Sequence, residues 1–238
     1  MLNQATNDAA NIVFLLDVDN TLLDNDRFAD DLGDTLEQAF GAGERERYWS
    51  IYEKLRDECG FADYLGALQR FRVGLDNEPA LLQMSRYLLE YPFADRLYPH
   101  ALETVAHLRR LAPTVILSDG DVVFQPRKIQ LAGLWEAVRG EVLIYVHKQH
   151  MLVAMQQRHP AAHYVMVDDK PQILGEMKQK LGHKLTTVFV RQGHYAEAAA
   201  TVNGPEPDLV IACIDELRRR KLDDFLPDAP TITLPAGG

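Results

Sequence analysis

Six short apolar runs stand out along the chain, and each is continuous rather than alternating with polar residues. They are rich in Val and Ile, which is typical of strands buried on both faces of a parallel sheet. Apolar residues at helical spacing follow in the stretches 101–111 and 173–181. This alternation of strands and helices predicts an α/β fold with a doubly wound parallel sheet. The runs lie at residues 11–17, 113–119, 141–148, 163–170, 185–191 and 207–212.

Residues 25–95 break this rhythm, because they contain no strand-like run and at least four stretches with helical spacing. A crossover between parallel strands needs only about a dozen residues, so the segment is predicted to be a separate, all-helical subdomain. The polar stretch at Asp24, Asn25 and Asp26 is read as the hinge into it. The predicted organisation is a core at 1–24 and 96–225, a helical insert at 25–95 and a Pro/Gly-rich tail at 226–238.

Composition narrows the class of protein. The chain has 238 residues and a formal net charge of −10, which disfavours non-specific binding to nucleic acid or to an anionic membrane. No apolar run reaches about 18 residues, and the N-terminal stretch lacks the basic and apolar regions of a signal peptide. The two cysteines are far apart, which suits a reducing compartment. We therefore expect a soluble cytoplasmic protein without nucleic-acid or membrane partners.

Polar groups follow several of the predicted strands, at the edge of the sheet where ligands bind in open α/β folds. Two carboxylates follow the first strand, and a Ser-Asp-Gly sequence ends the second. A lysine ends the third strand, and a pair of aspartates ends the fourth. These groups are Asp17, Asp19, Ser118, Asp119, Gly120, Lys148, Asp168 and Asp169.

Each of these residues also has a structural interpretation, since an aspartate after a strand often caps a turn or helix. Their matched positions on successive strands favour a functional site instead. Four carboxylates at one edge would repel one another unless a cation lay among them. An oxygen-rich set without cysteine fits Mg²⁺ better than zinc.

Taken together, "DVDNT" (17–21), "LSDG" (117–120), Lys148 and "VMVDD" (165–169) resemble the four ordered motifs of the haloacid dehalogenase superfamily. The resemblance spans roughly residues 12–215, and the helical insert falls where that superfamily has its C1-type cap. It implies a Rossmann-like core and points to the phosphatase branch of the superfamily.

The resemblance also implies roles for individual residues. Asp17 would be the nucleophile that forms an aspartyl-phosphate, and Asp19 the acid and base that serves the leaving group and then the water. Lys148 would offset negative charge. The implied phosphate-binding residues are Thr21, Ser118, Asp119, Gly120 and Lys148. The implied Mg²⁺ ligands are Asp17, Asp19 through its backbone carbonyl, Asp169 directly and Asp168 directly or through water.

One departure from the family's motifs and several alternative functions stay open. Asp119 stands where the family usually has asparagine, which places a negative charge beside a phosphate site. Metal-independent 2-haloacid dehalogenases share the nucleophile but generally lack a residue equivalent to Asp19. Phosphomutase or phosphonatase activity, or a non-catalytic binding protein with this fold, would be compatible with parts of the pattern.

The remaining expectations concern the substrate and its surroundings. A helical cap implies a small phosphorylated metabolite as substrate. Arg27 and Phe28 follow the first motif closely and are expected near the site, whereas His147 is assigned a structural role. The basic run 218–221 is interpreted as a solvated face at the end of a helix. The sequence leaves the oligomeric state open between monomer and homodimer.

Overall fold

A six-stranded parallel sheet forms the centre of the computed structural model, which describes residues 12–75, 78–196 and 204–226. The strands follow the order β3-β2-β1-β4-β5-β6. From β1, the strands β2 and β3 extend the sheet to one side, and β4, β5 and β6 extend it to the other. Each predicted apolar run contains one strand, and the predicted fold class is confirmed. The strands are β1 (Ile12–Leu16), β2 (Thr114–Asp119), β3 (Val142–Tyr145), β4 (His163–Asp168), β5 (Leu185–Val190) and β6 (Leu209–Ile211).

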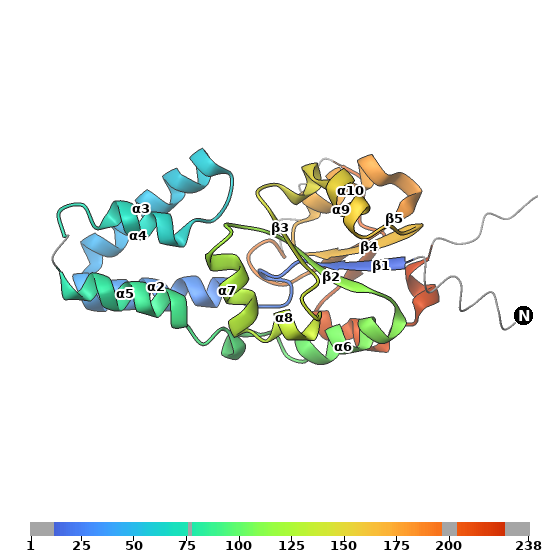
Figure 1. Cartoon of the computed structure of the whole chain (residues 1–238), viewed down its shortest axis with the longest axis horizontal. Coiled ribbons are helices and arrows are strands. Elements are labelled where there is room, and N and C mark those ends of the chain that lie inside the picture. Colours follow the sequence, from blue (N-terminus) through green and yellow to red (C-terminus); the bar gives the residue numbers. More distant parts are fainter. Residues whose placement is uncertain (1–11, 76–77, 197–203, 227–238) are drawn as a thin grey trace, which may run out of the picture.

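Helices cover both faces of this sheet (Figure 1), which explains why the strand sequences are continuously apolar. Alternate residues of β1 point to opposite faces, so Phe14 packs on one side and Leu15 on the other. The Phe14 side carries α6 (Ala101–Leu111), α8 (Leu134–Ala137) and the 3₁₀ helices Ile214–Arg219 and Leu222–Phe225. The Leu15 side carries α9 (Leu152–Arg158) and α10 (Pro171–Leu181). Two further 3₁₀ turns are Lys148–His150 and Gly182–Lys184.

The segment after β1 is helical, as its apolar spacing predicts, and lies at one end of the sheet (Figure 1). Residues Ile214–Arg219 form a 3₁₀ helix that buries Ile214 and Leu217, which differs from the α-helix expected before the basic run 218–221. Within the insert, aromatic residues at helical spacing are buried, and they belong to the same hydrophobic cluster as the Phe14 side of the sheet. The helices of the insert are α2 (Asn25–Phe40), α3 (Ala42–Cys59), α4 (Tyr64–Phe71), α5 (Pro79–Glu90) and the 3₁₀ helix η2 (Phe93–Arg96).

The chain leaves the core and returns to it at one place. Leu23 forms an antiparallel bridge with Leu97, and the Asp24 backbone N–H donates to the Arg96 carbonyl at 2.7 Å. The Asp24 side chain then accepts from the Arg27 N–H at 2.9 Å, which caps the first turn of α2. The two crossing segments therefore run side by side, and the first helix of the insert begins directly after them.

One core helix reaches the insert. Helix α7 (Phe124–Leu131) packs against α5 and η2, and the Arg127 Nε donates to the Leu89 carbonyl at 3.1 Å. Its start is defined by Asp121, whose Oδ1 accepts from the N–H groups of Val123 and Phe124, each at 2.7 Å. Pro126 fits the first turn, where a backbone donor is not needed. Helix α7 therefore lies between the sheet and the insert.

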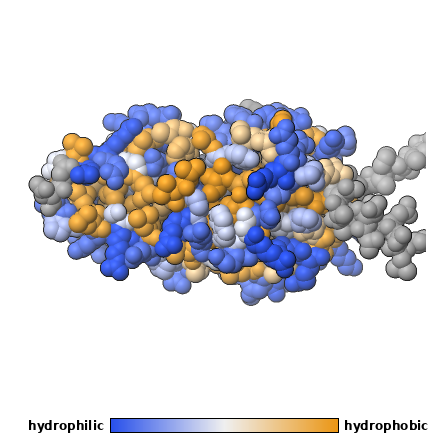
Figure 2. All heavy atoms as spheres, viewed as in Figure 1, coloured by the Kyte–Doolittle hydropathy of each residue, from blue (hydrophilic) through white to orange (hydrophobic). Residues whose placement is uncertain are grey.

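Hydrophobic atoms gather along the middle of the face drawn in Figure 2, over the insert and where it meets the core. Hydrophilic atoms occupy most of the upper and lower margins of that face. Among the described residues, no helix combines the length and hydropathy that spanning a membrane requires.

Phe28 connects the insert to the core, because its buried ring lies 4.9–5.9 Å from the rings of four other aromatic residues. We expect Phe28→Ala to lower the free energy of unfolding by about 3–5 kcal/mol, as removal of a buried aromatic ring does. Leu82, 76% exposed on α5, provides the control, and Leu82→Ala should cost less than about 0.5 kcal/mol. Urea unfolding measures both, and equal losses would contradict this account of the interface.

Candidate active site

Asp17 directly follows β1, where its backbone continues the pairing with β4. The Asp17 N–H donates to the Val167 carbonyl at 3.0 Å, which places Asp17 beside the end of β4. The carboxyl group is buried, and the Thr21 hydroxyl donates to its Oδ2 at 3.2 Å. Asp17 therefore projects from the carboxyl edge of the sheet with one oxygen held by its own loop.

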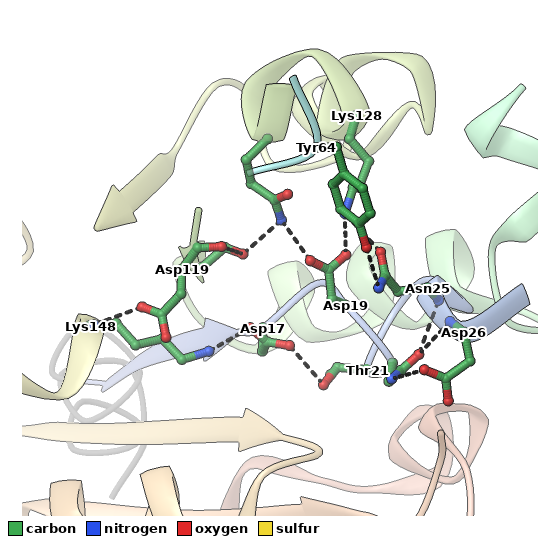
Figure 3. Close-up of polar contacts among 12 residues, drawn as sticks. Asp17, Asp19, Thr21, Asn25, Asp26, Tyr64, Asp119, Lys128 and Lys148 are labelled. Carbon is green, nitrogen blue, oxygen red and sulfur yellow. Dashed lines mark hydrogen bonds and ion pairs between the residues drawn. The ribbon is translucent and has the colours of Figure 1, made fainter. Parts of the chain in front are cut away.

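Lys148 supplies a buried positive charge at the same place (Figure 3). Its Nζ lies 2.5 Å from Asp17 Oδ1 and 2.7 Å from Asp168 Oδ2. The backbone N–H of Lys148 donates to Asp119 Oδ1 at 2.7 Å, so Asp119 holds the loop that carries the lysine. This contact gives Asp119 a defined function at the position where the family usually has asparagine.

Asp168 and Asp169 differ in their bonding although they are neighbours in the sequence. Asp168 pairs with Lys148 and accepts the Lys170 backbone N–H on its other oxygen at 2.8 Å. Asp169 is fully buried, and neither of its oxygens has a hydrogen-bond partner among the residues that the structure describes. One oxygen each from Asp17, Asp168 and Asp169 lie within 4.8 Å of one another.

Burial and the short distances between these charged groups shift their pKa values. Burial, with Asp168 adding to it and Lys148 opposing it, raises the pKa of Asp17 to about 6. Burial next to the carboxylates of Asp168 and Asp17 raises the pKa of Asp169 to about 9. Burial disfavours the Lys148 ammonium, but Asp168 and Asp17 outweigh it and hold its pKa above the usual range. The pKa of Lys170 is raised by the same three carboxylates against its burial.

These observations test whether the residues suit a divalent cation. The ammonium of Lys148 contacts two of the three buried carboxylates, and Asp169 has no hydrogen-bond partner among the described residues, although the charge of Lys170 also acts on all three. Carboxylate oxygens are ligands that Mg²⁺ prefers, and an ion there would compensate the charge on Asp169. The residues present therefore fit the predicted Mg²⁺.

Gln125 contacts both Ser118 and Gly120 at the end of the second strand. Ser118 is buried, and its hydroxyl accepts from Gln125 Nε2 at 3.0 Å. Gly120 lies against the same glutamine, because a Cβ at this position would come within 2.8 Å of Gln125 Cβ. Gln125 comes from α7, so this helix helps to shape the loop that follows β2.

Asp19 lies between Asp17 and the insert and is bound on both oxygens (Figure 3). Its Oδ1 accepts from Lys128 Nζ at 2.7 Å, and its Oδ2 accepts from Gln125 Nε2 at 3.2 Å. Lys128 Nζ also donates to Asn25 Oδ1 at 3.0 Å, and Asn25 Nδ2 donates to the Tyr64 hydroxyl at 3.4 Å. This network joins the first-motif loop to α2 and α4 of the insert.

The structure brings the residues predicted from the strand ends to one edge, and it adds others that the sequence analysis missed. Asn25 was assigned to the hinge, and Gln125, Lys128, Tyr64 and Lys170 were not assigned to the site. The usable signal was the spacing of three between Gln125 and Lys128, which puts both on one helix face beside the Ser-Asp-Gly motif.

Arg27 and Phe28, which follow the first motif, differ in burial. The Arg27 side chain is 60% exposed and pairs with Asp31, so it points away from the site, whereas Phe28 is buried in the aromatic cluster at the interface. His147 is exposed and lies against the insert, where a Cβ on Gly60 would come within 2.6 Å of its Nε2.

Comparison with known proteins identifies relatives. The sequence model of the haloacid dehalogenase-like hydrolases matches residues 13–172. A solved structure from Burkholderia xenovorans LB400, described as a haloacid dehalogenase-like hydrolase, is 53% identical with a TM-score of 0.83. The match covers 89% of this chain and 99% of that one. No curated protein matches.

More distant structures share the fold. An L-2-haloacid dehalogenase from Xanthobacter autotrophicus is 19% identical with a TM-score of 0.57, and the match covers 87% of this chain and 96% of that one. The HAD-hydrolase YfnB from Bacillus subtilis, solved with bound magnesium, is 17% identical with a TM-score of 0.56, covering 87% and 97%. At these identities the likeness concerns the fold alone.

The raised pKa of Asp169 predicts how the stability of the metal-free protein depends on pH. The folded state holds this proton up to about pH 9, whereas an unfolded aspartate releases it near pH 4. The contribution of this proton to the free energy of unfolding is therefore complete below about pH 4 and is lost as pH rises toward about 9. In Asp169→Asn the loss between about pH 7 and 9 should disappear, leaving the variant more stable at the upper end by about 1–3 kcal/mol.

Thermal unfolding in a chelator at several pH values measures this effect. Asp57→Asn, on the exposed face of α3, provides the control and should keep the wild-type pH dependence. A wild-type pH dependence in Asp169→Asn would contradict the assignment of the proton to this group.

Proposed function

Because the chain belongs to the haloacid dehalogenase-like hydrolase family, we propose that this hydrolase cleaves a small phosphate monoester, with Asp17 as nucleophile and Mg²⁺ as cofactor. The observation that carries the proposal is the buried carboxyl group of Asp169, which lies beside Asp17 without a partner among the described residues. A bound Mg²⁺ would account for this buried carboxylate, which otherwise has no hydrogen-bond partner among the described residues.

The first step uses Asp17 and Asp19. An oxygen of Asp17 attacks phosphorus in line with the ester oxygen, and the bond between phosphorus and the ester oxygen breaks. The electron pair goes to the departing oxygen, which takes a proton from the Asp19 carboxyl group. Asp17 then carries the phosphoryl group, and the alcohol leaves on the side of the insert, where Asp19 lies.

The second step releases phosphate. Asp19, now a carboxylate, accepts a proton from a water molecule that attacks phosphorus, and the bond to the Asp17 oxygen breaks. Inorganic phosphate leaves, and both carboxyl groups return to their starting states. The same group therefore acts first as acid and then as base.

Charge repulsion is the main obstacle to this chemistry, because a carboxylate must approach a phosphate dianion. Lys148, 2.5 Å from Asp17 Oδ1, reduces the negative charge on the nucleophile. The Ser118 hydroxyl would donate a hydrogen bond to a phosphoryl oxygen, whereas the Gly120 N–H already donates to the Tyr145 carbonyl at 2.9 Å. Asp17, Asp169 and the Asp19 carbonyl would hold Mg²⁺, with Asp168 supporting them, and the ion would supply further positive charge for the phosphoryl group.

The chemistry around the site supports a small substrate. The contacts of Asp19 continue through Lys128 and Asn25 to Tyr64 on α4, so the leaving group would meet residues of the insert. A helical insert next to the catalytic carboxylates favours a small phosphorylated metabolite over a phosphoprotein. Cys59 and Cys213 are both free thiols, which supports a cytoplasmic location.

Asp17→Asn tests the nucleophile directly. With p-nitrophenyl phosphate and Mg²⁺, we expect wild-type protein to release phosphate and the variant to lose about 10⁴-fold or more of kcat/KM, because an amide cannot form the covalent intermediate. Asp57→Asn, an exposed substitution on α3, should keep wild-type activity. Chloride release from a 2-haloacid without metal, together with no phosphate release from a panel of phosphorylated metabolites, would instead identify a dehalogenase.

Magnesium binding can be measured without any substrate. At 100 times its dissociation constant, Mg²⁺ should stabilise the wild-type protein by about 2.7 kcal/mol, because it binds the folded state only. Asp169→Asn should lose most of this gain. A gain of the same size in the variant would exclude Asp169 as a ligand.

A further inference from the structure

Lys128 is a buried charge whose partners lie in three different parts of the chain. Only 1% of its surface is exposed, and a lysine that is buried to this extent almost always has a partner. Its ammonium donates to Asp19 Oδ1 at 2.7 Å and to Asn25 Oδ1 at 3.0 Å (Figure 3). Asp19 belongs to the first-motif loop, Asn25 to the start of α2, and Lys128 to α7.

Aromatic rings complete the surroundings of this ammonium. Its Nζ lies 5.5–5.9 Å from four ring centroids, within the range of cation–π attraction. The rings exclude water and replace part of the lost hydration. The four rings belong to Phe28, Tyr64, Phe93 and Phe124.

Packing alone does not require a charge at this position. A methionine of similar length would fill the same space among the rings without the cost of removing an ammonium from water. The charge therefore has to be explained by what it binds, and its shortest contact is the Asp19 carboxylate.

Gln125 holds the other side of the same carboxyl group. Its Nε2 donates to Asp19 Oδ2 at 3.2 Å and to the Ser118 hydroxyl at 3.0 Å. Gln125 and Lys128 are three residues apart on α7 and so lie on one face of that helix. One helix thus fixes both oxygens of Asp19, whose side chain is still 23% exposed.

We propose that Lys128 is a positioning residue for Asp19: its hydrogen bond to Oδ1 holds the carboxyl group so that Oδ2, which would carry the proton, meets the leaving-group oxygen. The inference rests on the proposed phosphatase function. Proton transfer depends on placement, and displacing a catalytic group by about 1 Å can cost a factor of about 10² in rate. The Lys128 ammonium bonds to Asp19 and Asn25, so in this proposal it acts on the reaction through Asp19.

A series of aryl phosphates tests this role. Departure of a basic oxygen depends strongly on protonation, whereas the p-nitrophenolate anion leaves with little help. In Lys128→Met, kcat/KM should fall about 10²-fold or more with phenyl phosphate but less than about tenfold with p-nitrophenyl phosphate. Lys128→Arg, which keeps the charge, should recover part of the activity toward phenyl phosphate.

Lys178→Met is the matched control. Lys178 is a partly buried lysine on α10 that pairs with Asp208 at 2.7 Å, away from Asp19. Its loss should change the two esters by the same small factor. Thermal unfolding of all variants shows whether they are folded, and if Lys128→Met is not, Lys128→Gln carries the same comparison without the charge.

Each result is decisive. Equal losses on both esters in folded Lys128→Met, as in the control, would show that Lys128 only supports the fold and would overturn the inference. A wild-type protein that hydrolyses none of the esters would instead refute the proposed phosphatase function, and the role of Lys128 with it.

Discussion

The ammonium of Lys148, buried between Asp17 and Asp168, is the contact on which the rest of the site depends. Without it, carboxylates from β1 and β4 would face each other in a medium that screens charge weakly. Removing one partner from such a buried pair leaves an uncompensated charge. Asp119 holds the loop that carries the lysine, so three neighbouring strands converge on this one positive charge.

Lys148 does not contact all of the carboxylates at the site. Lys148 contacts Asp17 and Asp168, while Asp169 stays buried without a partner among the described residues. A protein that keeps such a carboxylate gives up folding stability for it, which is common at functional sites. A second buried lysine, Lys128, repeats the pattern on the side of the insert, where its ammonium pairs with Asp19. Of the two aspartates in the first motif, Asp17 thus pairs with Lys148 and Asp19 with Lys128.

Much of this arrangement can be predicted from local sequence. Continuous Val- and Ile-rich runs indicate buried parallel strands, and the carboxyl ends of such strands meet at one edge of the sheet. Asp17, Ser118, Lys148 and Asp168 could therefore be placed together before any coordinates were known. The helical insert was equally visible, since a segment of about 70 residues is too long for a crossover and repeats apolar residues at helical spacing.

The sequence by itself determined the fold class, the family and the edge of the sheet where the polar groups gather, because these follow from short-range periodicity and motif order. Only the tertiary structure decided which polar residues beyond the strand ends join them. Lys128 and Asp19 are 109 residues apart, and Lys128 on a helix looks like any solvated lysine until the insert packs over it. The structure also distinguished Asp168, which pairs with Lys148, from Asp169, which has no hydrogen-bond partner among the described residues, because the bonding of adjacent identical residues depends on groups brought from distant strands.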